Sequence, residues 1–132
     1  MKKQAENDQP VPLPAGGQKF AVQLTSQDGR EKFLLDLSRG RIDLRKIKIQ
    51  NRARSVVILA RLDLSGRPHR NPDGEDVPTP HLHLYCEDYG DKWAKPLPKD
   101  IFPDTKNELK ILEDFMRFCN IRSIAEVQMN LL

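Results

Sequence analysis

The alternation of hydrophobic and polar side chains predicts β-strands through the first two thirds of the chain. In residues 19–25 and 30–38 every second side chain is apolar, which is the two-residue period of a strand with one buried face. Asp28-Gly29 lies between these segments and favours a hairpin turn, because both residue types tolerate positive φ. The two strands are therefore expected to pair antiparallel.

Three further strands follow from the same pattern. Over residues 42–49 the alternation changes phase, which predicts a bulge near Arg45-Lys46. Residues 55–64 form the most apolar segment, expected at the centre of the sheet. Residues 81–86 alternate again, so that Leu82 and Leu84 should face the core while His81 and His83 face the opposite side.

A helix is predicted near the C-terminus and a tail at the N-terminus. Residues 107–120 have an amphipathic pattern with the apolar stripe Leu109, Leu112, Phe115, Met116 and Cys119. Residues 123–132 are expected to add a short helix or strand. Residues 1–16 contain three prolines and no apolar period, which predicts a disordered tail before a single domain over 17–132.

The expected fold class is α+β: a five-stranded antiparallel meander with the C-terminal amphipathic helix packed on one face. The length of 132 residues suits one domain. No apolar run approaches the roughly 18–20 residues that span a bilayer. Two cysteines are too few for a disulfide scaffold, so we expect a cytoplasmic protein with reduced thiols.

The distribution of charge is more informative than the net value of +3. Residues 30–70 hold twelve basic side chains against four acidic ones, a net charge of +8. Residues 71–132 hold seven basic against twelve acidic side chains, a net charge of −5. The basic section indicates a polyanionic partner, unless the acidic section folds back and neutralises it. The candidate nucleic-acid-binding residues are Lys46, Lys48, Arg52, Arg54, Arg67 and Arg70.

All three histidines lie in one window, from His69 to His83. Histidine titrates near neutral pH and is the commonest metal ligand, so this clustering indicates a site. Arg61 and Asp63 lie just upstream of this window, on the most apolar predicted strand. The five candidate catalytic residues are therefore His69, His81, His83, Arg61 and Asp63. A polar loop that merely contains histidines is the alternative.

Metal binding is the first chemical hypothesis for this window. His81 and His83 are two residues apart on a strand and project to the same side, and His69 or Asp63 could complete an open three-ligand site. No Cys or Glu is spaced to complete an obvious ligand set, so we rank this hypothesis below a metal-free one and expect no metal and no cofactor.

Metal-independent RNA cleavage is the second hypothesis. It needs two groups that titrate near neutrality and cations that stabilise the charge on the reacting phosphate. Histidine acid–base pairs on a basic sheet face, with Arg61, Arg67 and Arg70 around them, would supply both.

Several short motifs resemble known families. His81-Leu82-His83 resembles the His-hydrophobic-His core of nicking endonucleases and transposases, although residues 107–120 lack the tyrosine that those enzymes carry on a helix. Arg61-Leu-Asp63, Pro68-His69 and Pro80-His-Leu-His83 resemble the motifs of TumE-type toxins, which implies a toxin-like ribonuclease with a small antitoxin protein as partner. The whole chain is also similar to an uncharacterised family of small bacterial and prophage proteins with the pattern RLDLxGxPHxNPDG followed by HLHLY.

The third hypothesis is non-enzymatic. The long loop over residues 65–79 would be a recognition surface of a phage or mobile-element protein that binds and inhibits a nucleoprotein complex, as an anti-defence protein does. The expected partners are thus RNA or a nucleoprotein complex, and no membrane.

Overall fold

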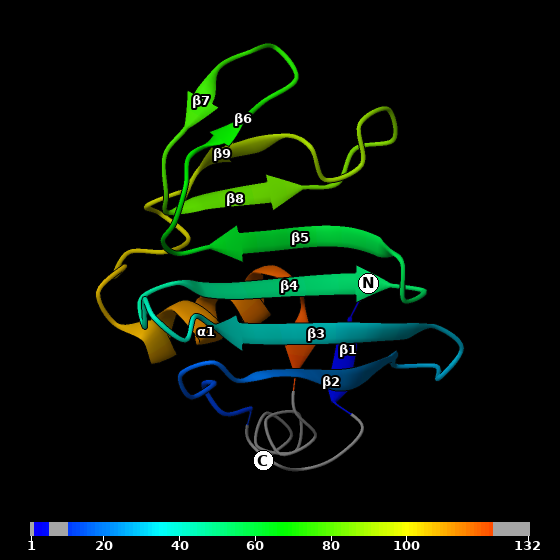
Figure 1. Ribbon diagram of the computed structural model, residues 1–132. Coiled ribbons are helices and arrows are strands. Elements are labelled where there is room, and N and C mark those ends of the chain that lie inside the picture. Colours follow the sequence, from blue (N-terminus) through cyan, green and yellow to red (C-terminus); the bar gives the residue numbers. More distant parts are fainter. Residues whose placement is uncertain (1, 6–10, 123–132) are drawn as a thin grey trace.

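The computed structural model describes residues 2–5 and 11–122, which form one mixed sheet backed by a helix (Figure 1). The order of strands across the sheet is β10-β1-β2-β3-β4-β5-β8-β9. The pair β1–β10 is parallel, and all other neighbours are antiparallel. The strand bounds are β1 Lys3–Ala5, β2 Lys19–Ser26, β3 Lys32–Arg39, β4 Ile47–Ala53, β5 Val57–Asp63, β8 His81–Leu84, β9 Ala94–Pro96 and β10 Ile121–Arg122.

The predicted meander is present, but the sheet is larger than predicted. Strands β2, β3, β4, β5 and β8 are neighbours in chain order, as the alternation pattern requires. Three short strands extend this meander: β1 and β10 at one edge and β9 at the other. Segments of two or three residues carry too little periodicity to be recognised from sequence.

The core lies between the sheet and helix α1 (Glu108–Phe118), which is behind the sheet in Figure 1. Side chains from five meander strands meet the helix residues Ile111, Leu112 and Phe115 in one cluster. The sheet residues of this cluster that are at most 1% exposed are Leu24, Leu35, Leu37, Ile49, Leu62 and Leu82. The α+β class is confirmed, with the helix packed on one face of the sheet.

The helix has the expected extent, and its buried face agrees with the predicted stripe except at Leu109. Asn107 caps its first turn, and its side chain accepts a hydrogen bond from the Lys110 backbone amide. Leu109, predicted to lie in the apolar stripe, is 51% exposed, whereas Ile111 is buried. Leu112, Phe115, Met116 and Cys119 face the core as predicted. Residues 123–132, for which a further element was predicted, lie outside the described residues.

The third strand was placed too early in the sequence. β4 begins at Ile47, and Ile42 in the preceding turn is 98% exposed. Asp43 holds that turn, because its side chain accepts a hydrogen bond from the Arg45 amide and its carbonyl accepts one from Lys46. The predicted bulge near Arg45-Lys46 was wrong, because the phase change there is this turn. A different register shift occurs between Asn51 and Arg52, where β4 pairs with β5.

The N-terminal segment is not wholly a tail. Lys3 and Ala5 are buried in β1, which lies between β2 and β10. Val11 and Leu13 pack against the core cluster. Residues 3–5 pair with strands that are distant in sequence, and a local pattern does not predict such pairing. Residues 6–10 lie outside the described residues.

A separate two-stranded hairpin, β6 (His69–Arg70) and β7 (Asp76–Val77), interrupts the meander between β5 and β8. Asn71 fixes this hairpin to β9 through two hydrogen bonds with the backbone of Ala94, at 2.9 and 2.8 Å. None of the described helices is long and apolar enough to cross a membrane.

Candidate functional site

The register of the sheet brings the polar candidate residues to the face opposite α1. Leu62 of β5 pairs with Leu82 of β8, and both side chains are buried in the core. Their neighbours must therefore point to the other face, where Arg61 pairs with His83 and Asp63 pairs with His81. On the other side of β5, Lys48 pairs with Asp63, so that Lys48 lies on the same polar face.

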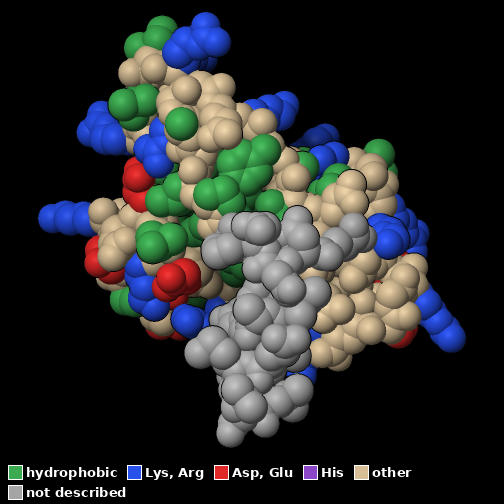
Figure 2. Space-filling model, turned by 90° about the horizontal axis from the view of Figure 1, so that it is seen from below, with side chains coloured by type: hydrophobic (Ala, Val, Ile, Leu, Met, Phe, Trp, Pro, Cys, Tyr) green, Lys and Arg blue, Asp and Glu red, His purple; other side chains and the backbone are tan. Residues whose placement is uncertain are grey.

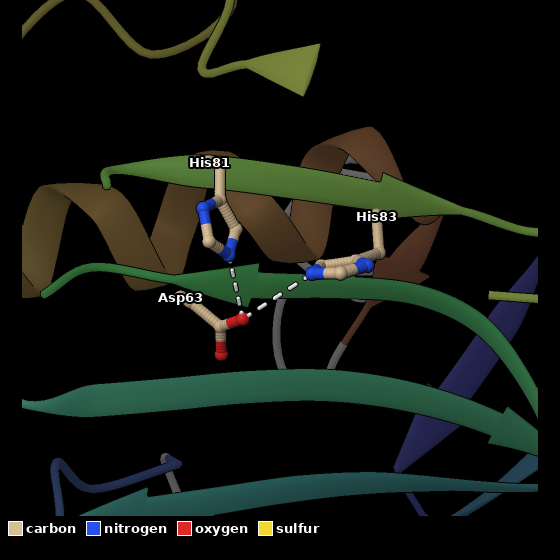
Figure 3. A group of neighbouring side chains, drawn as sticks. All are labelled: Asp63, His81 and His83. Carbon is tan, nitrogen blue, oxygen red and sulfur yellow. Dashed lines mark hydrogen bonds and ion pairs between the residues drawn. The ribbon is translucent and has the colours of Figure 1, made fainter. Parts of the chain in front are cut away.

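Asp63, His81 and His83 form a compact cluster on this face (Figure 3). Oδ2 of Asp63 lies 2.9 Å from Nε2 of His81 and 3.4 Å from Nε2 of His83. One nitrogen from each histidine and one carboxylate oxygen all lie within 4.8 Å of one another. The spacing of His81 and His83 in the sequence thus identified a real convergence of side chains.

The other ring nitrogen of each histidine contacts a backbone carbonyl. Nδ1 of His83 lies 2.7 Å from the carbonyl oxygen of Asp91, and Nδ1 of His81 lies 3.2 Å from that of Val77. These contacts fix the ring planes and direct both Nε2 atoms toward Asp63. Both carbonyls belong to segments that cross over the polar face after β5.

The histidines are buried, although the polar face was expected to be open. His81 is 2% exposed and His83 is fully buried. His69, from β6, covers them: its ring is 4.4 Å from the His83 ring, and its Nε2 contacts the carbonyl oxygen of Lys92. The three histidines are therefore neighbours, but the hairpin that brings His69 to the cluster also shields the cluster from solvent.

Asp63 is held in its ionised form. Burial alone would raise its pKa, but hydrogen bonding to His83, the charge of Arg61 and hydrogen bonding to His81 together lower the pKa well below the usual range. Lys48, its partner on β4, acts in the same direction. The cluster consequently presents a negative oxygen between two imidazole rings.

Arg61 connects this cluster to the open part of the face. Its Nη2 lies 2.9 Å from Nε2 of His83, and its Nη1 lies 3.3 Å from Oδ2 of Asp91. The same side chain lines a groove of about 410 Å³ over the neighbouring strands. The groove is lined by Lys19, Asp36, Leu37, Ser38, Lys48, Gln50, Arg52 and Arg61.

The groove contains only two of the six residues proposed from sequence to bind nucleic acid, Lys48 and Arg52. Two bonds tie Arg52 to Asp36, from Nε to Oδ2 at 2.5 Å and from Nη2 to Oδ1 at 2.9 Å, and this pairing raises the pKa of the guanidinium. Lys19 of β2 was missed because it lies far from the basic section in the sequence. Only the strand pairing of Lys19 with Ser38 brings it to the groove.

The other four proposed residues do not line the groove. Lys46 precedes β4, Arg54 lies in the β4–β5 turn, and Arg67 lies in the loop before β6; all three are exposed. Arg70 of β6 pairs with Asp76 of β7. Lys and Arg side chains accordingly project from several sides of the outline in Figure 2, rather than forming one surface.

The acidic section neutralises part of the basic section. Glu108 at the start of α1 binds Arg39 through two hydrogen bonds, and Asp91 pairs with Arg61. Arg52 and Arg45 pair instead with acids from their own section. Neutralisation by the acidic section thus explains part of the charge asymmetry, and the groove keeps several basic side chains.

The comparisons with known proteins identify a family whose function is unknown. A model of the DUF6978 family of unknown function matches residues 1–121. The chain therefore belongs to this family, in agreement with its expected similarity to uncharacterised proteins. No curated protein and no solved structure matches it.

Proposed function

We propose that this member of a family of unknown function binds RNA in the groove on the polar face of the sheet. The observation that carries the proposal is the groove itself, in which Lys19, Lys48 and Arg61 converge from three different strands. Its volume of about 410 Å³ is within the usual range of small-ligand sites, about 300–1,000 Å³. Such a groove suits a short single-stranded segment better than a duplex.

The lining favours contacts to phosphate rather than to bases. None of the described residues that line the groove is aromatic, so base stacking would not contribute to binding. Asp36 binds Arg52 at 2.5 Å, whereas the pairing of Arg61 with Asp91 is longer, at 3.3 Å, and could be exchanged for a phosphate. The main phosphate contacts are therefore Lys19, Lys48 and Arg61. Binding of this kind tolerates many sequences and weakens steeply with salt.

The salt dependence gives a quantitative test. With three phosphate contacts on a single strand, log Kobs should fall with log[salt] with a slope of about −2, since each contact contributes about −0.7. Lys19→Ser combined with Lys48→Ser removes two contacts and should bring the slope to about −0.7. Fluorescence anisotropy with a labelled oligoribonucleotide, at several salt concentrations, measures both slopes.

A matched control separates the groove from net charge. Lys99→Ser combined with Lys106→Ser removes the same charge from exposed positions that do not line the groove. This variant should keep the wild-type slope. Equal losses in the two double variants would mean that RNA is attracted by overall charge, and the absence of any binding at low salt would refute the proposal.

The burial of the histidines favours binding over cleavage. A general acid or base must reach the proton that it transfers. His81 and His83 are at most 2% exposed under the β6–β7 hairpin, so RNA in the groove would meet Arg61 before either imidazole. We expect oligoribonucleotides to remain intact with the protein; cleavage that His83→Ala abolishes would instead support the toxin-like ribonuclease hypothesis.

A further inference from the structure

We propose that Asp63, His81 and His83 bind a divalent first-row transition metal ion such as Zn²⁺. The proposal goes beyond RNA binding and rests on different residues, because none of these three side chains lines the groove. It also reverses the ranking drawn from the sequence, where no Cys or Glu was spaced to complete a ligand set. The carboxylate comes instead from Asp63, which the pairing of β5 with β8 places beside both histidines.

The separations of Asp63 Oδ2 from the two histidine nitrogens suit a metal ion. Zinc–nitrogen and zinc–oxygen bonds of about 2.0–2.2 Å place adjacent ligand atoms about 3.0 Å apart in an octahedral site and about 3.4 Å apart in a tetrahedral one. The observed separations from Oδ2 of Asp63 are 2.9 Å to His81 and 3.4 Å to His83. Small side-chain movements would therefore complete the coordination.

The backbone contacts of the histidines leave the correct nitrogens free for a metal. A carbonyl oxygen can only accept a hydrogen bond, so Nδ1 of His83 carries hydrogen toward Asp91, and Nδ1 of His81 carries hydrogen toward Val77. In the neutral imidazole each Nε2 then has a lone pair for the metal ion, which would take the place of the proton that a hydrogen bond from Nε2 to Asp63 requires. Histidines that bind metals are commonly oriented in this way by carbonyl or carboxylate acceptors.

Arg61 approaches the cluster from one side, with Nε 3.4 Å from Oδ2 of Asp63, and leaves the contact between His81 and Asp63 to be balanced. Nε2 of His81 and Oδ2 of Asp63 face each other at 2.9 Å, an arrangement that needs either a proton or a cation between the two atoms. Oδ1 of Asp63 is buried and has no hydrogen bond to any described residue. A metal ion at this place would satisfy both oxygens and both imidazoles.

A bound metal ion would displace Arg61 from His83. Its Nη2 donates to Nε2 of His83, the atom that the metal would use. Asp91 offers the guanidinium a second partner at 3.3 Å, and the groove offers it a phosphate. We therefore expect Arg61 to turn away from His83 and retain its charge balance when the metal binds.

Cobalt provides the direct test, because Co²⁺ substitutes for Zn²⁺ and absorbs visible light when protein ligands bind it. The full chain, treated with EDTA and dialysed, should bind one equivalent of Co²⁺ with new visible absorption that added Zn²⁺ displaces. Zn²⁺ should also raise the melting temperature, since it binds only the folded cluster. Failure of both ions to bind saturably would overturn the proposal without any variant.

Variants locate the site. Asp63→Asn and His81→Ala should each weaken Co²⁺ binding at least tenfold, as losses of ligands do. Asp88→Asn is the matched control, because Asp88 is exposed and does not belong to the group of three ligand atoms. If His81→Ala fails to fold, as circular dichroism would show, Asp63→Asn decides, since it keeps the size of the side chain.

The outcomes are distinct from those of RNA binding. Undiminished Co²⁺ binding by the folded Asp63→Asn variant would overturn the assignment of the ligands. The Lys19→Ser variant alone should bind Co²⁺ normally, whether or not it binds RNA, because Lys19 lines the groove but does not belong to the group of three ligand atoms.

Discussion

At the scale of single residues, the burial of a leucine side chain should decide how much it contributes to the stability of the fold. Leu82 is fully buried in the core, so Leu82→Ala should lower the free energy of unfolding by roughly 2–5 kcal/mol. Leu109→Ala, on the exposed side of α1, removes the same atoms and should change little. Urea denaturation followed by circular dichroism measures both; equal effects would mean that Leu82 is not in the core.

Strand β8 shows how far the sequence alone can reach. Strand alternation correctly placed His81 and His83 on the face opposite Leu82, because the two-residue period is a local property. It could not reveal that both histidines are buried. The cover comes from His69 and from the carbonyls of Val77 and Asp91, which reach the cluster only through the tertiary fold.

At the scale of elements, the start of α1 depends on one side chain. Asn107 Oδ1 accepts a hydrogen bond from the Lys110 amide, which would otherwise lack an intrahelical partner. Asn107→Ala should therefore cost about 1 kcal/mol of stability, and Asn107→Ser should recover most of it. Thermal melts of the two variants and of a Lys106→Ala control test this, and a full loss in Asn107→Ser would contradict the capping role.

Elements with a long period were predictable, and those fixed by tertiary pairing were not. The helix extends over 14 predicted positions, enough for its amphipathic pattern to show, and the structure places it at Glu108–Phe118. β4 shifted because the Asp43 turn occupies residues that continue the alternation in the sequence. β1, β9 and β10 are two or three residues long and exist only through their partners.

At the scale of the whole molecule, the two ends of the described chain are in direct contact. Lys3 of β1 donates from its backbone amide to the Asn120 carbonyl and from Nζ to the Cys119 carbonyl, next to the parallel β1–β10 pair. Burial raises the pKa of the Cys119 thiol to about 11, against the opposing effects of Lys3 and Asn51. Cys119 can therefore report whether β1 is in place.

Removal of residues 1–5 should release this thiol. In the full chain at pH 8, Cys86, which is partly exposed, should react with a thiol reagent well before Cys119. The truncated chain should lose that difference and melt at a lower temperature. Lys2→Ser, at an exposed position, is the control and should leave both rates unchanged.

The pH dependence has a definite sign. The folded state keeps the Cys119 proton above the ordinary pKa of 9.0, so this contribution to stability is complete below about pH 9 and is lost as the pH rises toward 11. The melting temperature should therefore fall less between pH 9 and pH 11 in Cys119→Ser than in the wild-type protein.

The thiol-reactivity experiment has a contrary outcome of its own. If Cys119 reacts as fast as Cys86 in the full chain, β1 does not cover the end of α1, and the two chain ends are not coupled.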